Sequence, residues 1–172
     1  MRIPLKPLTL TGVIASVALL TACASVGNVK PGTSYESLLA QYGKPSVICP
    51  AKDGSTRLVW SEGGAGEQAW AVTVDKEQQV ANVTQLMHES AFDVLKQGQW
   101  DTHDVRCQFG TPAMVRSYGD NKNDIVWQYR FYGPAGEYDM LFVTFDRTTN
   151  QMVSYSTGPD PELNLTLLGG GR

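Results

Sequence analysis

Histidine, cysteine and positive charge are all scarce in this sequence. Its 172 residues include 2 His and 3 Cys, and 14 Lys and Arg stand against 17 Asp and Glu. So few His and Cys leave little material for a metal site or a disulfide-dense scaffold. The mildly acidic balance argues against nucleic acid as a partner, because binding that backbone requires clustered Lys and Arg. The length fits one ordinary domain or two very small ones, and an apolar content of 42% argues against global disorder.

Only one stretch is apolar enough to raise the question of a membrane. Residues 8–20 follow the positive charges of Arg2 and Lys6 and are apolar apart from Thr, Ser and Gly. This stretch is too short for a permanent membrane-spanning helix, and it is typical of the central region of a secretory signal. The sequence therefore predicts a signal peptide over residues 1–22.

The residues that follow the apolar stretch, Leu-Thr-Ala-Cys at 20–23, resemble the lipobox of bacterial lipoproteins. The resemblance implies that the Cys23 thiol carries a diacylglyceryl group, that the signal is cut before it, and that the new amine is acylated. Several acyl chains, each methylene contributing about 0.8 kcal/mol, hold a protein on a membrane without a spanning helix. With Ala24 rather than Asp after the cysteine, the resemblance favours the outer membrane, with the mature chain facing the periplasm.

The mature part of the sequence repeats one pattern. Gly43 and Pro45 recur as Gly110 and Pro112, each pair following a Gln and an aromatic residue, and Trp60 recurs as Trp127 at the same spacing. The matches keep one order with small insertions, which predicts a tandem duplication. We assign repeat 1 to residues 32–87 and repeat 2 to residues 88–157.

Each repeat is predicted to begin with a short helix. Thr33 and Glu36 have the spacing of a capping box, and Asp101 and Asp104 form its weaker counterpart. Glycine after the last turn suits a left-handed cap, and the proline two residues later prevents continuation of the helix. A further helix is predicted over residues 91–96, with Ser90 as its N-cap. The apolar stripe of the first helix comprises Tyr35, Leu38, Leu39 and Tyr42.

Alternating patterns predict four strands in each repeat, and the short connections favour antiparallel meanders. The predicted fold class is therefore α+β, with helices packed on one face of an antiparallel sheet, twice. In the strand over residues 125–132 we expect Gln128 and Arg130 to face outward. Residues 158–172 are predicted to be a loose tail, and residues 23–31 a lipidated tether. The predicted strands are 46–49, 57–61, 70–75, 80–86, 113–118, 125–132, 140–146 and 152–156.

The repeated pattern resembles the SmpA/OmlA (BamE-like) family of outer-membrane lipoproteins. This resemblance implies a non-catalytic binding module that is accessory to outer-membrane protein assembly or envelope integrity, with the β-barrel assembly machinery as its partner. Members of this family carry one such unit, whereas this chain carries two. The residues that carry the resemblance are Gly32-Thr33-Ser34, Leu38-Leu39, Gly43-Lys44-Pro45 and Trp60, then Gly98, Val105, Phe109-Gly110-Thr111-Pro112 and residues 125–131.

A tandem pair of these units is also similar to the β-lactamase inhibitory proteins, whose concave sheet clamps a loop of an enzyme. This second resemblance leaves an alternative function open, in which the chain is a tethered inhibitor or sensor of a periplasmic enzyme.

Motifs for catalysis or metal binding are not evident in the sequence. His88 and His103 lack ligand partners at a recognised metal-site spacing, so we expect no metal. There is no Gly-x-Ser-x-Gly motif, and the glycine-rich residues 63–66 lack the Lys and Ser/Thr of a phosphate-binding loop. The sequence therefore predicts neither an enzyme nor a cofactor.

Five side chains remain as candidates for a structural link or a contact surface. Cys49 and Cys107 are an even pair in an oxidising compartment, so they form either a disulfide that joins the two repeats or two small buried residues. Tyr132 and Tyr138 flank a Gly-Pro-Ala-Gly turn, and Trp70 follows the corresponding loop of repeat 1. Most aromatic residues of sheets are buried, but those beside loops often anchor partners, so these three are the predicted partner-binding residues.

Overall fold

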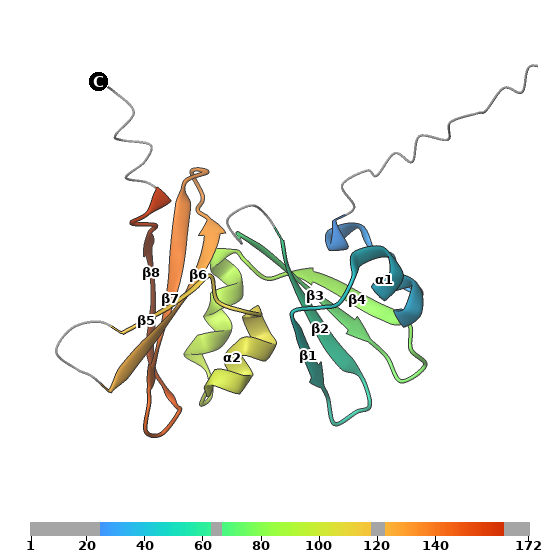
Figure 1. Ribbon diagram of the computed structural model, residues 1–172, viewed down its shortest axis with the longest axis horizontal. Coiled ribbons are helices and arrows are strands. Elements are labelled where there is room, and N and C mark those ends of the chain that lie inside the picture. Colours follow the sequence, from blue (N-terminus) through green and yellow to red (C-terminus); the bar gives the residue numbers. More distant parts are fainter. Residues whose placement is uncertain (1–24, 63–66, 118–122, 164–172) are drawn as a thin grey trace, which may run out of the picture.

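The computed structural model describes residues 25–62, 67–117 and 123–163, which form two four-stranded antiparallel sheets (Figure 1). In each sheet the strands lie in chain order, so both sheets are simple meanders. This arrangement confirms the predicted α+β fold of two similar units. The first sheet contains β1 (Val47–Pro50), β2 (Thr56–Glu62), β3 (Gln68–Val74) and β4 (Val80–Gln85), and the second contains β5 (Met114–Arg116), β6 (Asp124–Tyr132), β7 (Tyr138–Asp146) and β8 (Met152–Pro159).

Helices and sheets alternate as four layers. The α-helix α1 (Tyr35–Tyr42) and the short 3-10 helix η1 (Val26–Asn28) lie on one face of the first sheet, and α2 (Thr102–Phe109) lies between the two sheets (Figure 1). The 3-10 helix η2 (Glu89–Lys96) contributes Phe92 and Leu95 to the same layer as α2. The first sheet is consequently covered on both of its faces.

The alternation of side chains along β2 explains how one strand serves two cores. Leu58 and Trp60 face the smaller cluster beneath α1, whereas Val59 faces the larger cluster between the sheets. Successive strand residues point to opposite faces, so the central strands β2 and β3, which are covered on both faces, have few exposed positions. The larger cluster contains a series of aromatic rings, with Phe92 in edge contact with Phe109 and Phe131 at centroid distances of 5.7 and 4.9 Å. This cluster joins the two units into one core.

Two of the three predicted helix starts are wrong. Helix α1 is capped by Ser34, whose hydroxyl accepts from the Ser37 amide, because the Thr33 backbone is held by Val80 at the edge of the sheet. Helix η2 begins after His88 rather than after Ser90, and the Ser90 hydroxyl lies 2.9 Å from His88 Nδ1.

The capping box predicted at the third helix start is confirmed. Asp101 accepts from the Asp104 amide at the N-terminus of α2, and Asp104 accepts from the Asp101 amide.

Residues 25–31 belong to the folded body, so the predicted tether is wrong over this range. Val26 and Val29 are buried in the smaller cluster. The Ser25 hydroxyl and the Val26 amide donate to the two oxygens of Glu62, at 2.7 and 2.9 Å. The signal peptide, Cys23, the glycine-rich residues 63–66 and residues 164–172 of the predicted tail lie outside the described residues.

The predicted loose tail is also wrong over residues 158–163. Strand β8 continues to Pro159, and the fully buried Asp160 accepts a hydrogen bond from Arg130 Nε and two from the Glu162 and Leu163 amides. Gln128 and Arg130 lie on the face opposite the larger cluster, as predicted, but they are buried there rather than exposed to solvent. Because Glu162 also binds Arg116 of β5, residues 160–162 cross the face of the second sheet that points away from the larger cluster.

Asp160 is expected to make the stability of the fold sensitive to acid. Burial raises the pKa of its carboxyl, but the hydrogen bonds from Arg130 and from the two amides outweigh this and lower the pKa below the ordinary 3.8. A lowered pKa stabilises the fold fully above the unfolded pKa, and this stabilisation is lost as the pH falls through the folded pKa. We expect Asp160→Asn to lower the free energy of unfolding by about 3 kcal/mol at pH 7.

Urea unfolding of the wild type and of Asp160→Asn at several pH values measures this dependence. The difference between the two proteins should shrink below about pH 4, as the wild-type carboxyl gains its proton. An equal difference at pH 7 and at pH 3 would contradict the assigned role of Asp160.

The glycines that end α1 and α2 provide a matched pair for testing how closely the units approach. Gly43 has φ +73° and ψ −166°, and Gly110 has φ +87° and ψ −156°, a region that side chains strongly disfavour. A Cβ at Gly43 would meet nothing within 4 Å, whereas one at Gly110 would lie 2.9 Å from Val59 Cγ1 of the first sheet. Replacing either glycine with alanine would strain the backbone, but only the replacement at Gly110 would also cause a steric clash.

We expect Gly43→Ala to lower the free energy of unfolding by about 2 kcal/mol through backbone strain alone. Gly110→Ala should cost at least about 1 kcal/mol more, because Val59 must shift. Chemical denaturation of both variants measures the two losses. Equal losses would mean that α2 and the first sheet are packed less closely than described.

Candidate functional site

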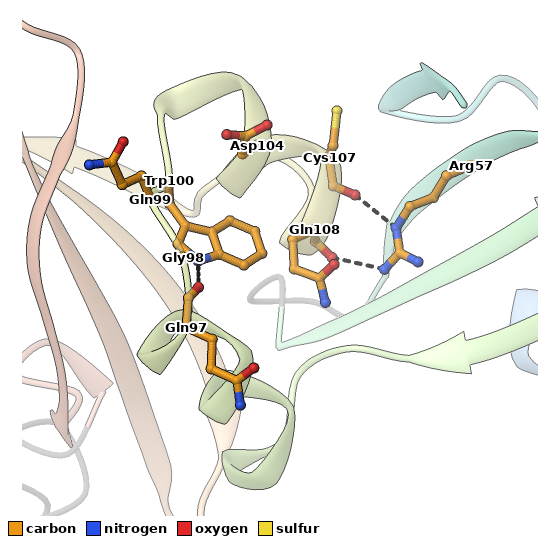
Figure 2. Close-up of a pocket in the computed structure, with 8 residues that line it drawn as sticks. All are labelled: Arg57, Gln97, Gly98, Gln99, Trp100, Asp104, Cys107 and Gln108. Atoms are coloured by element: carbon orange, nitrogen blue, oxygen red, sulfur yellow. Dashed lines mark hydrogen bonds between the residues drawn. The ribbon is translucent and has the colours of Figure 1, made fainter. Parts of the chain in front are cut away.

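Helix α2 is fastened to the first sheet at its C-terminal end. Arg57 of β2 donates from Nε to the Cys107 carbonyl at 2.9 Å and from Nη2 to the Gln108 carbonyl at 3.1 Å (Figure 2). These carbonyls carry the partial negative charge of the helix end, which a cation stabilises. Burial lowers the pKa of the Arg57 guanidinium, which remains positively charged at neutral pH.

A disulfide also joins α2 to the first sheet, through β1. Cys49 of β1 and Cys107 of α2 are bonded, with their Cα atoms 5.9 Å apart. Of the two alternatives that the sequence leaves open, the structure contains the disulfide. The cysteines are 58 positions apart, and closing a loop of that length stabilises a fold by about 4 kcal/mol in the chain-entropy description. The bridge holds repeat 1 against repeat 2.

An open hollow of about 410 Å³ lies beside this junction (Figure 2). Its charged side chains, Arg57 and Asp104, bind opposite ends of α2. Arg57 binds the C-terminal carbonyls, and Asp104 accepts from the Asp101 amide in the capping box at the N-terminus. Trp100 also lines the hollow, and its indole donates to the Gln97 carbonyl at 2.8 Å. The hollow was not evident from the sequence, because Arg57 is distant in the chain from residues 97–108, which supply the rest of the lining.

The two predicted tyrosines meet at the end of the β6–β7 hairpin. Tyr132 and Tyr138 are cross-strand partners, with ring centroids 4.8 Å apart and hydroxyl oxygens 2.9 Å apart. Tyr132 is 44% exposed, and its hydroxyl donates to Glu67 of repeat 1 at 3.5 Å. The tyrosine pair therefore lies where the two units meet, beside the start of β3.

Carboxyl groups lie at the same end of the hairpin, with Glu67 beside the Tyr132 hydroxyl and with Glu137 and Asp139 on either side of Tyr138 in the chain. Burial raises the pKa of Asp139, and repulsion from Glu137 and Glu89 raises it further. The hydrogen bond with Tyr138 raises the pKa of Tyr132 to about 12, with smaller contributions from burial and from Glu67, so this hydroxyl stays neutral at physiological pH. We call Tyr132, Tyr138, Glu67, Glu137 and Asp139 the tyrosine patch; it is aromatic and negatively charged.

The structure does not bring Trp70 together with the tyrosine patch. Trp70 is half-buried in the smaller cluster, and its ring lies against Gly27 of η1 so closely that a Cβ there would meet ring carbons at 2.5 to 2.8 Å. The N-terminal residues that the sequence analysis assigned to a tether are what cover this ring.

One group of potential metal ligands is brought together within the described ranges, although the sequence analysis expected none. The ligand atoms of Cys49, His103 and Cys107 all lie within 4.8 Å of one another. His103 and Cys107 are four residues apart in α2 and so share one face of the helix. That spacing was visible in the sequence, but the contribution of Cys49 from β1 required the fold.

Comparisons with known proteins leave the family unassigned. No protein-family model matches the chain, and no curated protein matches it. One similar solved structure is an extracellular protein containing an SCP domain from Bacillus anthracis str. Ames, at 18% identity and a TM-score of 0.28. The match covers 94% of this chain and 52% of that protein, so the chain spans about half of its length.

Among the residues that the structure describes, no helix is long and apolar enough to cross a membrane.

Proposed function

We propose that this protein is an outer-membrane lipoprotein that faces the periplasm and acts as a non-catalytic binding module in outer-membrane protein assembly. The observation that carries the proposal is the pair of the exposed Tyr132 and the half-buried Tyr138 at the junction of two tandem units, in a chain whose residues 20–23 resemble a lipobox. The resemblance to the SmpA/OmlA (BamE-like) family supplies the assembly role and its partner, the β-barrel assembly machinery.

The position of the folded body relative to Cys23 supports attachment close to a membrane. Ser25 and Val26 are already bonded to Glu62 at the end of β2. A lipid on Cys23 is thus only two residues from the body, a span of about 7 Å for an extended chain. The anchor would hold the edge formed by η1 and the end of β2 near the membrane surface, rather than leave the body on a long tether.

The chemistry of the tyrosine patch suggests the kind of surface that it binds. Two phenol rings tilted by 34° to each other offer apolar area, and the carboxylate of Glu67 beside the Tyr132 hydroxyl offers negative charge. Lys and Arg side chains complement such a surface, because their stems pack on aromatic rings while their charged ends pair with carboxylates. We therefore expect the partner to present basic residues to the β6–β7 hairpin.

The alternative function, a tethered inhibitor of a periplasmic enzyme, is less well supported. An inhibitor of the clamping kind uses an open concave sheet face rich in aromatic residues. Here the aromatic face of the second sheet, with Trp127, Tyr129 and Phe131, is buried in the cluster that includes Phe109 of α2 and Phe92 of η2. Within the described residues, Tyr132 at the hairpin end is the aromatic residue among the exposed large hydrophobic side chains, which favours a smaller contact with an assembly component.

Deletion of the gene, followed by complementation, tests the proposed function. We expect deletion to lower the amounts of β-barrel proteins in the outer membrane and to raise sensitivity to bulky antibiotics. A copy with Tyr132→Ala and Tyr138→Ala should fail to restore either property, since the tyrosine patch loses its aromatic contacts.

A Val153→Ala copy is the matched control, because Val153 is 61% exposed on β8 at the opposite end of the second sheet. This copy should restore both properties. Normal β-barrel protein levels in the deletion strain, or full restoration by the tyrosine variant at equal abundance, would argue against the proposal.

A further inference from the structure

We infer that reduction of the Cys49–Cys107 disulfide creates a binding site for a thiophilic divalent cation such as Zn²⁺. The ligands of this site are the two cysteine sulfurs and Nε2 of His103. The inference concerns the junction between the units and is independent of the tyrosine patch.

The geometry around α2 matches zinc coordination. His103 Nε2 lies 3.5 Å from Cys107 Sγ. Tetrahedral zinc, with Zn–S bonds of about 2.3 Å and Zn–N bonds of about 2.0–2.1 Å, separates a sulfur and a nitrogen ligand by about 3.6 Å. Two residues of this set are already at the spacing that the ion requires, and their positions one helical turn apart keep them there.

The third ligand is supplied by the other unit. Cys49 is buried on β1, with its Cα 5.9 Å from that of Cys107. After reduction the two sulfurs need to separate only to about 3.8 Å to bind one zinc ion, which side-chain rotation accomplishes without a change of backbone. All three ligand atoms already lie within 4.8 Å of one another.

Arg57 keeps the site assembled when the covalent bond is absent. Its two hydrogen bonds to the Cys107 and Gln108 carbonyls hold the end of α2 against β2, the strand paired with β1. Val59 packs against Gly110 in the same region. These contacts do not involve the sulfurs, so reduction leaves Cys49 and Cys107 facing each other.

The site is reachable from solvent and leaves one coordination position open. His103 is exposed and Cys107 is half-buried, whereas Cys49 lies beneath them. Three protein ligands and one open position form the arrangement in which zinc retains a water molecule or accepts an external ligand.

The chemistry balances as a two-electron exchange with a dithiol reductant. One thiolate of the reductant attacks a sulfur of the bridge to form a mixed disulfide, and its second thiol releases the protein as two thiols and the reductant as a disulfide. Zinc then displaces one proton from each cysteine thiol and binds the neutral His103. Reoxidation of the two sulfurs removes both thiolate ligands, so the disulfide and the metal exclude each other.

Metal titration of the full mature chain in detergent tests the inference. The protein is reduced with dithiothreitol, desalted under argon and titrated with Co²⁺, whose tetrahedral thiolate complexes absorb strongly, and then with Zn²⁺ in competition. We expect the reduced chain to bind one equivalent with a thiolate-to-cobalt absorption band, and the oxidised chain to show none.

His103→Ala is the informative variant because it leaves both cysteines in place. It should weaken binding by at least about tenfold. His88→Ala is its matched control, since His88 is the other histidine and lies outside the group. Circular dichroism with and without zinc follows the fold of each reduced protein.

Three outcomes would overturn the inference. The first is a reduced chain that stays folded and binds no metal, and the second is a reduced chain that unfolds and is not refolded by zinc. The third is binding of equal strength in His103→Ala and His88→Ala, which would assign any bound metal to the cysteines alone.

Discussion

Replacing Cys23 with alanine is expected to remove the protein from the outer-membrane fraction. The proposed anchor is a set of acyl chains on this one residue, and without the thiol no diacylglyceryl group is attached. Fractionation of the cell envelope measures the location, and intact-mass spectrometry of the mature chain measures the acyl groups. We expect the outer-membrane pool to fall by more than about tenfold and the lipid mass to disappear.

The other two cysteines provide the control for this experiment. A chain with both Cys49→Ala and Cys107→Ala loses the disulfide but keeps Cys23, so it should retain its acyl groups and its place in the membrane fraction. An unchanged location of Cys23→Ala, with no lipid mass in the wild type, would show that the lipobox resemblance is misleading.

Phe109→Ala is expected to be among the most destabilising single substitutions in the described fold. Phe109 is fully buried in the cluster between the sheets, where its ring centroid lies 5.7 Å from that of Phe92 and 6.0 Å from that of Tyr129. Truncating such a side chain removes its transfer free energy and leaves a cavity, which together cost about 4 kcal/mol. Because Phe109 lies in the core that both units share, we expect the whole protein to unfold in a single cooperative transition at a lower urea concentration.

Urea unfolding followed by tryptophan fluorescence measures the effect. Ile48→Ala is a suitable control, because Ile48 is 53% exposed on β1 and its truncation should change the free energy of unfolding by no more than about 0.5 kcal/mol. A loss below about 1 kcal/mol in Phe109→Ala, or two separate transitions in the wild type, would mean that the units do not share one core.

The sequence predicts the strands well because the signal for each strand is local. Alternation along β6 and turn residues such as Gly133-Pro134 place strand ends within a few residues. The errors arise where a distant partner decides the structure. Val26 and Val29 form too short a pattern to reveal burial, and Arg130 looks like a solvent-facing residue until Asp160, 30 positions later, is placed beside it.

Only those residues of the tyrosine patch that lie beside a turn could be predicted from the sequence. Tyr132 and Tyr138 flank a turn whose Gly and Pro residues are visible in the sequence, whereas Glu67 comes from the other repeat and gave no signal. Trp70 is an aromatic residue beside a loop, as contact residues often are, but η1 covers its ring. Contacts between the two repeats depend on how α2 packs between the sheets, and no local sequence pattern predicts that packing.

The central claim is that a lipid-anchored chain binds the β-barrel assembly machinery through the tyrosine patch, and site-specific photocrosslinking in intact cells tests it most directly. A photoreactive amino acid replaces Tyr132 in one strain and the exposed Val153 in another, with Cys23 intact in both. The account predicts that a component of the assembly machinery is crosslinked from position 132 and not from position 153. The absence of that component at position 132, equal capture from both positions, or a periplasmic enzyme in its place would contradict the account.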